Sequence, residues 1–450
     1  MFSKFSEIAN SFNEAGFEFY AVGGCVRDSQ LGISSNDFDF TTDALGKEIE
    51  KILKPFASAM NVVGKTFGTI GAMVDADWIE VTTFRKEIYR KESRKPEVTF
   101  STTLEEDLIR RDFTVNSMAY DILKNKLIDP FGGLEDLKNK ILRTPQSAEK
   151  SFSDDPLRML RAARFMCGFE LTPTTDVIEG IAKVKSRLSI VSKERIRDEL
   201  CKLLVVKDPT AGLWFLSKTK LSDEFFPELN QMKMEQDPIQ KHKDVLAHSI
   251  AVVKNTDPEL LVRLAALFHD IAKPATRKIT ENGVSFHHHE VVGAKMTRIR
   301  MKELKFSSDL IQKVSKLVFL HLRIHTFSFG WTDSAVRRYV RDAGELLDEL
   351  NHLQRCDCTT RNPRRAAELQ RRMDDLEDRI ADLKKKEELD SIKPDIDGDE
   401  IMSILDLKPG KDVGMALKHL TEIRLDKGQL TKAEWKVELL EWAKDNLKQQ

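Results

Sequence analysis

Two aspartates two positions apart are the residues of this chain whose spacing most directly suggests chemistry. Asp37 and Asp39 occur in the segment DFDF, whose short aromatic pattern predicts a strand. Alternate side chains of a strand point to the same face, so both carboxylates are expected side by side. Mg²⁺ binds one or two protein carboxylates together with the phosphate oxygens of a substrate. The pair is therefore predicted to be catalytic and to hold Mg²⁺ for phosphoryl transfer.

A glycine pair and an arginine precede these aspartates. Gly23 and Gly24 follow the predicted strand FEFYAV, and their missing side chains let backbone N–H groups approach an anion closely. Arg27 is expected on the first turn of the next helix, where a guanidinium can bind a phosphate. An Asp-x-Asp pair alone is usually an ordinary acidic strand. Its combination with the glycines and the arginine in one strand–turn–helix–strand unit favours a nucleotide site.

The region that contains this unit resembles a known family, the class II tRNA nucleotidyltransferases and related bacterial poly(A) polymerases of the polymerase-β-like superfamily. The motifs that carry the resemblance are GGCVRDSQLG followed by DFDF, GKTFGT, WIEVTTFR, RRDFTVNSMAYD and IDPFGGLEDLKNKILRT. The resemblance implies that Glu80 supplies a third carboxylate. It also implies that the nucleotide's ribose and phosphates are contacted by Gly24, Arg27, Arg111, Asp112 and Asn116.

A second motif, DDPLRMLRAARF, resembles the family's segment that replaces a nucleic-acid template with protein side chains. Asp155 and Arg158 are three positions apart on a predicted helix and are therefore expected to be neighbours on its surface. One accepting and one donating group can read the polar edge of cytosine or adenine, whereas uracil and guanine invert part of that pattern. Arg161 and Arg164 continue at three-residue steps towards the expected triphosphate. The alternative is a plain surface ion pair.

The charged segment RKEIYRKESRKPEV between Phe84 and Phe100 is predicted to be a loop. It occupies the place of the family's flexible loop, which is associated with the switch from C to A addition. Its presence argues, by resemblance, against an enzyme that adds only the two C residues.

Eight of the ten histidines lie between residues 242 and 325, and their pattern resembles an HD phosphohydrolase domain. Imidazoles and carboxylates on facing helices are good ligands for Zn²⁺, Mn²⁺, Ni²⁺ or Fe, and a bound ion would lower the pKa of a water for attack on a phosphoester. His321 and His325 fall in the same stretch. Such domains also persist as packing scaffolds, so the sequence leaves activity open. The expected ligands are His248, His269, Asp270 and His289.

The elements that must position these residues divide the chain. Strand and helix signals alternate up to about residue 145, with helices predicted over GKEIEKILKPF and LEEDLIRRDFTVNSMAYDIL, and strand signals nearly vanish after Asp154. We expect an α+β nucleotidyltransferase head with a small mixed sheet plus helices, followed by an all-α neck, an HD domain and a helical tail. The expected ranges are 1–145 for the head, 146–230 for the nucleotide-selecting neck, 231–330 for the HD domain and 331–450 for the RNA-binding tail.

The tail contains a group of arginines and a short heptad pattern. Nine arginines lie between residues 337 and 373, in a segment that resembles bacterial, particularly actinobacterial, tRNA nucleotidyltransferases. They are expected to contact a tRNA acceptor arm through phosphates and 2′-hydroxyls, although a solvated helical face explains them equally well. The heptad pattern over 364–389 favours a helical hairpin arm over a free-standing coiled coil.

Composition excludes several classes of protein. The 450 residues include 72 Lys+Arg and 73 Asp+Glu, so the net charge of −1 excludes a highly basic nucleic-acid packager but not a local basic surface. The five cysteines are scattered, which argues against a disulfide scaffold. With no apolar run of signal-peptide or membrane-helix length, the sequence predicts a cytoplasmic enzyme without a membrane partner.

Together these features predict an enzyme that adds C, C and A to the 3′ end of tRNA from CTP and ATP and releases pyrophosphate. The RNA 3′-hydroxyl would attack the nucleotide α-phosphate in a Mg²⁺-dependent reaction. Two alternatives remain: a poly(A) polymerase of the same fold, and an HD phosphohydrolase whose head only binds nucleotide. No obligate protein partner is evident. The sequence leaves open the oligomeric state, the HD metal, and full CCA addition against A-only or CC-only addition.

Overall fold

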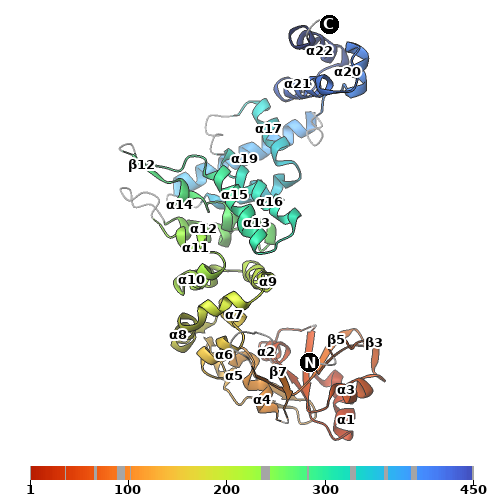
Figure 1. Ribbon diagram of the computed structural model, residues 1–450, viewed down its shortest axis with the longest axis vertical. Coiled ribbons are helices and arrows are strands. Elements are labelled where there is room, and N and C mark those ends of the chain that lie inside the picture. Colours follow the sequence, from red (N-terminus) through yellow and green to blue (C-terminus); the bar gives the residue numbers. More distant parts are fainter. Residues whose placement is uncertain are drawn as a thin grey trace. The chain divides into compact units, whose positions relative to one another are not determined.

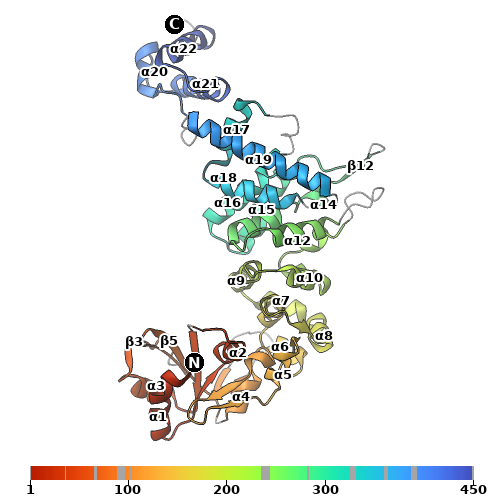
Figure 2. The ribbon, with the colours of Figure 1, turned by 180° about the vertical axis from the view of Figure 1, so that it is seen from behind.

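The computed structural model describes residues 2–35, 37–64, 68–88, 97–101, 103–234, 244–280, 283–324, 331–358, 363–386 and 393–447 (Figures 1 and 2). His242, His325 and the loop residues 89–96 lie outside these ranges. The chain forms two compact units, one of residues 1–231 with 303–305 and the other of 232–302 with 306–450.

The first unit begins with the mixed sheet and helices expected for the head. The seven-stranded sheet has the order β3-β4-β5-β2-β1-β8-β9, with β2 and β5 parallel and the other neighbours antiparallel. Its strands are β1 (Phe19–Val22), β2 (Asp37–Thr42), β3 (Ala57–Asn61), β4 (Thr69–Val74), β5 (Asp77–Thr83), β8 (Ala119–Asp121) and β9 (Lys126–Ile128). The accompanying helices are α1 (Ser6–Glu14), α2 (Gly24–Gln30), α3 (Gly46–Leu53), α4 (Leu104–Ile109) and α5 (Gly133–Lys138).

Aromatic packing fixes which face of β2 is turned to the core. The ring of Phe5, just before α1, lies 4.9 Å from that of Phe38 and 5.0 Å from that of Phe40. All three side chains are buried. Because strand side chains alternate, burial of these two phenylalanines leaves Asp37 and Asp39 on the opposite face, where both are exposed.

Two predicted elements of the head differ in the structure. The segment LEEDLIRRDFTVNSMAYDIL is not one helix, because α4 ends at Ile109, a short 3-10 turn covers Thr114–Asn116, and β8 follows. β8 pairs with β1, with Tyr20 opposite Asp121, so long-range strand pairing overrides the local helical pattern. The charged segment after Phe84 is also more than a loop, since β6 (Arg85–Ile88) and β7 (Glu97–Phe100) form an antiparallel pair.

The all-helical prediction for the rest of the chain is confirmed apart from two very short strand pairs among the described residues. In the first unit, β10 (Ile141–Leu142) pairs with β11 (Thr172–Pro173). The helices there are α6 (Ala148–Asp154), α7 (Leu157–Gly168), α8 (Thr175–Val184), α9 (Lys193–Leu204), α10 (Thr210–Lys218) and α11 (Glu228–Gln231). α7 packs against both α9 and α10, which builds a helical layer beside the head motifs.

The second unit is a helical body with a smaller helical end. Its helices are α12 (Val245–Asn255), α13 (Leu260–Phe268), α14 (Lys273–Thr276), α15 (His289–Glu303), α16 (Ser308–Leu320), α17 (Asp333–Ala343), α18 (Leu347–Asp357), α19 (Pro363–Lys386), α20 (Gly398–Leu405), α21 (Lys411–Lys427) and α22 (Lys432–Asn446). β12 (Lys278–Thr280) pairs with β13 (Gly283–Ser285). α20, α21 and α22 share their own core around the fully buried Trp435. Over the described residues, no helix is both long and apolar enough to cross a bilayer.

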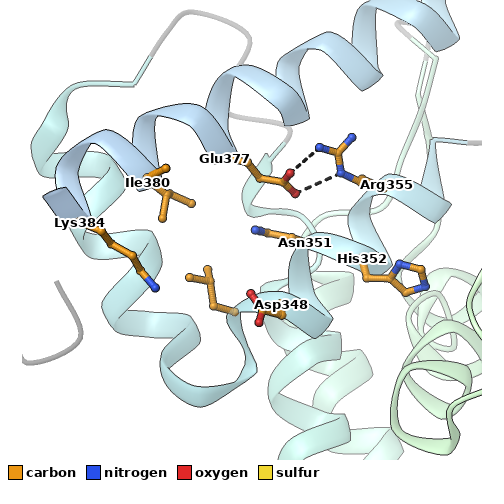
Figure 3. A pocket seen from close by; sticks show the side chains of 9 residues that line it. Asp348, Asn351, His352, Arg355, Glu377, Ile380 and Lys384 are labelled. Carbon is orange, nitrogen blue, oxygen red and sulfur yellow. Dashed lines mark hydrogen bonds and ion pairs between the residues drawn. The ribbon is translucent and has the colours of Figure 1, made fainter.

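The apolar heptad residues of α19 pack against other helices of this chain. Met373, Leu376, Ile380 and Leu383 are buried, and α19 packs against α17 and α18. Beside them, a cleft of about 430 Å³ runs between α18 and α19 and is crossed by the ion pair of Arg355 with Glu377 (Figure 3). The short heptad pattern is therefore explained by packing within this unit.

We predict that Gly133→Ala destabilises the head. A Cβ at Gly133 would lie 2.1 Å from the Thr114 carbonyl oxygen, so the 3-10 turn or α5 must shift. Such overpacking costs about 1–3 kcal/mol of unfolding free energy, measurable by urea unfolding. Gly168→Ala is the matched control, because a Cβ there meets nothing within 4 Å. Equal stability of the two variants would contradict the close approach.

Candidate functional sites

The two aspartates of β2 lie on the exposed face of the head sheet. Asp37 and Asp39 are both exposed, as the strand pattern predicts, while Phe38 between them is buried. Glu80 lies in register with Asp39 on the neighbouring parallel strand β5, so its carboxylate shares this face. Loss of hydration raises the pKa of Asp39; Arg111 opposes that rise, and Glu80 and Asp37 add to it. A cation would relieve this repulsion, so the donor set fits a divalent ion.

Gly23 brings the glycine turn against Asp39 and Arg111. Its φ of 75° lies in the left-handed region, and a Cβ there would come within 3.0 Å of Arg111 Nη1 and 3.6 Å of Asp39 Oδ2. The Nη2 of Arg111 donates to Asp107 Oδ2 at 3.1 Å. Asp107 is fully buried; burial would raise its pKa, but Arg110 and Arg111 lower it below the ordinary value. Asp107 thus holds Arg111 near the carboxylates.

Arg27 is engaged inside the protein. It lies one turn into α2, is buried, and donates to Asn116 Oδ1 at 2.7 Å and to Asp28 Oδ1 at 2.7 and 2.8 Å. Its guanidinium also stacks over the ring of Phe169, 4.1 Å from the ring centroid. The binding of a phosphate by Arg27 stays a prediction, and without nucleotide its guanidinium is held by Asn116 and Asp28. Gly24, as expected, begins α2.

A partly buried ion pair joins the ribose motif to the helices that follow the head. Arg161 on α7 donates to Asp112 Oδ2 through Nε at 2.8 Å and through Nη2 at 2.6 Å. The amide of Asn116 donates to the other oxygen of Asp112 at 2.9 Å. Burial alone would raise the pKa of Asp112, but Arg161 and Asn116 lower it to about 2. The carboxylate is thus ionised and fully paired.

Glu199 on α9 holds the next arginines. Its buried carboxylate accepts from Arg164 Nε at 2.8 Å and lies 3.7 Å from Arg161 Nη1. That these two arginines reach a triphosphate stays a prediction, and without nucleotide each guanidinium pairs with an acidic partner. The sequence analysis missed Glu199, although an acidic residue in a helix that packs on α7 was a possible signal.

The predicted helical pairing of Asp155 and Arg158 also needs correction. Asp155 lies between α6 and α7 in an extended conformation, so the two residues are not neighbours on one helix. Its Oδ1 accepts from the Leu157 backbone at 3.1 Å, and its Oδ2 lies 3.5 Å from Arg195 Nη2. Arg158 is buried and donates to Ser151 Oγ at 2.9 Å and to the Arg110 carbonyl at 2.5 Å. Pro156 interrupts the helix and causes the difference.

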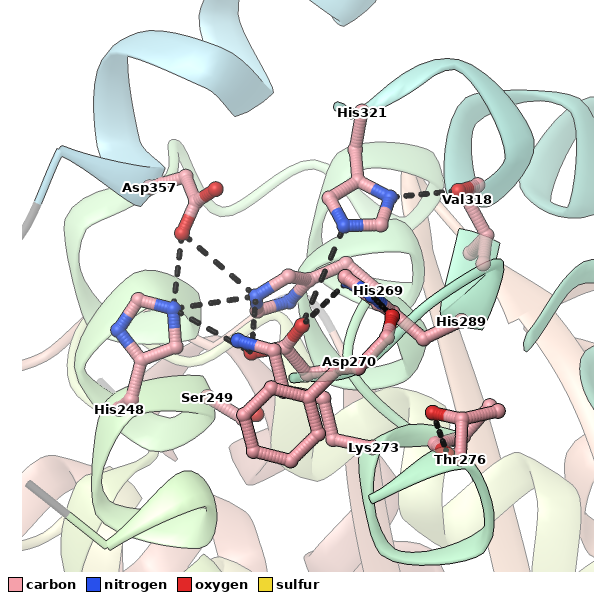
Figure 4. A network of polar contacts seen from close by, with 12 residues as sticks. His248, Ser249, His269, Asp270, Lys273, Thr276, His289, Val318, His321 and Asp357 are labelled. Carbon is pink, nitrogen blue, oxygen red and sulfur yellow. Dashed lines mark hydrogen bonds and ion pairs between the residues drawn. The ribbon is translucent and has the colours of Figure 1, made fainter. Parts of the chain in front are cut away.

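Six ligand-type side chains meet in the second unit (Figure 4). They come from five separate segments: α12, the end of α13, the start of α15, the end of α16 and the end of α18. The structure brings together all four residues expected from the HD resemblance and adds two more. The complete set is His248, His269, Asp270, His289, His321 and Asp357.

The pKa values of two histidines in this pocket are shifted in opposite directions. Burial would lower the pKa of His269, but Asp270 and Asp357 raise it to about 9. Burial lowers the pKa of His321 to about 3, so its imidazole is neutral at pH 7. Lys273 donates to Asp270 Oδ2 at 2.7 Å. With a pKa of about 9, His269 is protonated at pH 7 unless a bound ion displaces its proton. Imidazoles together with carboxylates form a donor set that suits a first-row transition metal.

Several arginines of the tail are paired within the second unit. Arg337 is buried and donates to the carbonyl of Leu425, and Arg338 pairs with Glu422 and Asp426. Arg355 pairs with Glu377 at 2.6 Å. For Arg337, Arg338 and Arg355, these contacts favour a packed and solvated helical surface, which is the alternative to tRNA contact.

Three regions of the chain match known protein-family domains. Residues 19–143 match the Poly A polymerase head domain, 168–233 match the probable RNA and SrmB-binding site of polymerase A, and 245–384 match the HD domain. The chain is 32% identical over 418 residues to the A-adding tRNA nucleotidyltransferase of Deinococcus radiodurans, covering 90% of each chain. The chain belongs to the tRNA nucleotidyltransferases. The class II resemblance drawn from its motifs is thereby confirmed.

This tRNA nucleotidyltransferase is also similar to a relative of higher identity over a shorter span, and to a solved structure over nearly its whole length. It is 44% identical over 214 residues to the CCA-adding enzyme of Bacillus subtilis, which covers 47% of this chain and 52% of that enzyme. The crystal structure of the Bacillus stearothermophilus CCA-adding enzyme in complex with CTP has a TM-score of 0.69 at 23% identity, covering 99% and 98% of the two chains. That likeness confirms the predicted fold class.

Three residues of these sites escaped the sequence analysis. Asp107 pairs with Arg110 and Arg111, three and four positions further along its own segment, so its spacing was a local signal that went unused. Glu199 and Asp357 instead act on partners in other elements, and they become visible only when distant segments pack together. Asp357 stands between two cysteines that drew attention only as thiols.

We predict that Asp112→Asn lowers stability in a pH-dependent way. The depressed pKa means that the ionised carboxylate stabilises the fold above pH 4, and that this contribution is lost as pH falls through about 2. At pH 7 the variant should lose about 2 kcal/mol of unfolding free energy, and the two proteins should converge towards pH 2. Urea unfolding followed by circular dichroism measures both.

Asp198→Asn is the control for this effect, because Asp198 makes an exposed pair with its neighbour Arg197. Its loss should change stability little at any pH. A constant difference between Asp112→Asn and wild type from pH 7 to pH 2 would show that the ion pair is not the source.

Proposed function

We propose that this tRNA nucleotidyltransferase adds C, C and A to the 3′ end of tRNA, using CTP and ATP and releasing pyrophosphate. The observation that carries the proposal is the exposed pair Asp37 and Asp39 facing the glycine turn and Arg111. A substrate phosphate at this face meets carboxylates on one side and a guanidinium on the other. With tRNA as its substrate, the enzyme is assigned to the cytoplasm.

Asp37 and Asp39 are assigned the catalytic role and the binding of Mg²⁺. When bound, the ion supplies charge neutralisation for the attacking hydroxyl and the leaving pyrophosphate. Arg111, oriented by Asp107, binds phosphate oxygens beside these carboxylates. Backbone N–H groups from Gly24 onward add donors at the turn.

The remaining motif residues form the wall that positions the nucleotide. Arg27, Asn116 and Asp112 form one hydrogen-bonded chain, and Arg161 extends it to α7. Such a preformed network lowers the cost of ordering the ribose and phosphates on binding. Arg164 is linked to this network through Glu199, whose carboxylate accepts from Arg164 Nε and lies close to Arg161. Base selection is assigned to Asp155 and Arg158, which must leave their present partners to meet a base edge.

We assign the chain's regions as follows: a catalytic head over 1–145, a nucleotide-selecting neck over 146–230, an HD domain over 231–330 and an RNA-binding tail over 331–450. The HD pocket is proposed to hold a transition metal such as Zn²⁺, Mn²⁺, Ni²⁺ or Fe and to act on phosphoesters. Its support is the cluster of imidazoles and carboxylates described above.

Addition of the terminal A alone is the second candidate. One specific observation favours it: the relative aligned over 90% of both chains is an A-adding enzyme, whereas the CCA-adding enzyme of Bacillus subtilis aligns over about half its length. Both candidates require the same head chemistry. They differ in whether CTP is accepted.

The test uses one tRNA prepared with no terminal addition, with C, or with CC at its 3′ end. We expect CTP and ATP to extend all three to a complete CCA end. Extension of the CC form alone, by one A, would replace the proposal with A-only addition. Repeated addition of A would indicate a poly(A) polymerase, and failure of all three would leave the head as a binding module.

In the same assay, Asp37→Asn and Asp39→Asn should each lower turnover about 100-fold or more, because the metal-binding charge is removed without loss of volume. Asp77→Asn is the matched control, since this head carboxylate pairs with Lys4 and lies on the face of β5 opposite to Glu80. Near-normal turnover by either of the first two variants would remove the carboxylates from the mechanism.

We predict that Asp155→Asn and Arg158→Gln reduce the discrimination between CTP and UTP. An unpaired buried donor or acceptor costs roughly 1–3 kcal/mol, so the ratio of kcat/KM values should fall roughly ten- to a hundredfold. Glu149→Gln on α6, which breaks only an exposed pair with Lys183, should leave the ratio unchanged. If CTP, ATP and UTP all slowed equally, the pair would be structural.

A further inference from the structure

We propose that Asp107 is a positioning residue that links recognition of the base to binding of the phosphates, because its carboxylate fixes the end of α4 between the two groups concerned. The inference rests on the proposed function, in which Arg111 binds phosphate oxygens and Arg158 meets the base edge. It goes beyond the orientation of Arg111 described above, since it assigns Asp107 a part in nucleotide selection.

Three consecutive residues after α4 reach three different parts of the proposed nucleotide site. The main-chain carbonyl of Arg110 accepts from Arg158 Nη2 at 2.5 Å. The guanidinium of Arg111 lies against the glycine turn that precedes α2. The carboxylate of Asp112 accepts from Arg161 on α7. A shift of this short segment therefore moves all three contacts together.

Asp107 holds this segment to the helix. Its side chain is fully buried. Oδ1 accepts from Arg110 Nε at 3.1 Å and from Arg110 Nη2 at 2.5 Å, and Oδ2 accepts from Arg111 Nη2 at 3.1 Å. One carboxylate thus engages two consecutive guanidinium groups, one with each oxygen. Hydrogen bonds between ionised groups are stronger than those between neutral groups, so the end of α4 is held firmly.

The two arginines use these bonds in different ways. Arg110 turns its side chain back onto its own helix, while its main-chain carbonyl contacts Arg158. Arg111 gives Nη2 to Asp107, and its Nε is buried without a hydrogen-bond partner in the described structure. A guanidinium has five N–H donors, so Arg111 keeps donors for a phosphate while one side of it is fixed.

A bound nucleotide spans the two groups that Asp107 keeps at a fixed separation. Its base draws Arg158 away from the Arg110 carbonyl, and its phosphates meet Arg111. Because the end of α4 is fixed, a base that pairs well with Arg158 places its phosphates correctly, whereas a mispaired base does not. Without the Asp107 carboxylate the segment can move, so a nucleotide with the wrong base can shift and still reach Arg111.

The test measures the addition of ATP and of GTP by the full-length chain to a tRNA that ends in CC. CCA addition, A-only addition and poly(A) synthesis all use ATP, so the measurement does not depend on whether CTP is accepted. Asp107→Asn should raise KM for ATP about tenfold, because Arg111 is no longer held, and leave KM for tRNA unchanged. The ratio of kcat/KM for ATP to that for GTP should fall about tenfold.

A merely structural role predicts a different result. Loss of folded protein lowers kcat per chain and leaves KM and the ratio of ATP to GTP unchanged. A double-mutant cycle tests the link itself. In the Arg158→Gln background, Asp107→Asn should lower the ratio no further, although it should still raise KM for ATP. Equal falls in the ratio with and without Arg158 would overturn the inference.

Arg110→Gln gives a second route to the same answer if Asp107→Asn folds poorly. This change removes one side-chain partner of Asp107 and keeps the main-chain carbonyl that Arg158 contacts. It should lower the ratio of ATP to GTP by a smaller factor, because Arg111 keeps its bond to Oδ2. Urea unfolding identifies which variants are folded in the assay. An unchanged ratio in a folded variant would count against the link.

Asp121→Asn is the matched control. Asp121 is another buried carboxylate of the head, and it also pairs with a cation three positions later, since Lys124 Nζ lies 3.0 Å from its Oδ2. The variant should keep the wild-type KM values and ratio. Absence of ATP addition by the wild type would overturn the proposed function itself. Normal ATP addition with an unchanged ratio in Asp107→Asn would overturn this inference alone.

Discussion

The ion pair of the buried Asp112 with Arg161 is the contact on which the arrangement of the first unit depends. Asp112 belongs to the turn after α4, whereas Arg161 belongs to α7, so the pair fixes the ribose motif against the helix that follows the head. Breaking a buried pair from one side leaves an uncompensated charge, which is far costlier than losing a surface pair. Glu199 extends the same tie to α9.

The consequence is that arginines expected to meet the substrate are already paired in this structure. Arg27, Arg161 and Arg164 each donate to internal acceptors, and only part of their hydrogen-bonding capacity remains. Such pairing keeps long side chains in one conformation and so reduces the entropy lost on binding. In this view the acidic partners Asp112 and Glu199 are positioning residues of the nucleotide wall.

The carboxylates of the head and those of the HD pocket lie in different electrostatic environments. In the head, carboxylates stand exposed on a sheet face, where water and substrate phosphates can reach them. In the HD pocket, carboxylates and imidazoles are buried among helices, and the backbone holds the imidazoles in one tautomer. An exposed carboxylate pair suits Mg²⁺, which keeps several waters, whereas a buried imidazole set suits a transition metal.

The sequence by itself determined those features that local periodicity and short motifs encode. The alternation in DFDF placed Asp37 and Asp39 on one face, because a strand has a period of two whatever surrounds it. The strand FEFYAV, which contains β1, and the helical character of the remainder followed from the same kind of pattern. The histidine pattern likewise led to four members of the HD cluster.

Only the tertiary structure decided which strands and side chains of distant segments pair with one another. Strand pairing with β1 turned part of a predicted helix into β8, and Pro156 removed Asp155 from the helix that carries Arg158. Asp357 joined the HD cluster from 87 positions beyond Asp270, a separation across which sequence spacing carries no information. Hydrogen bonds and ion pairs between distant segments depend on distances that packing sets, and local sequence patterns do not contain those distances.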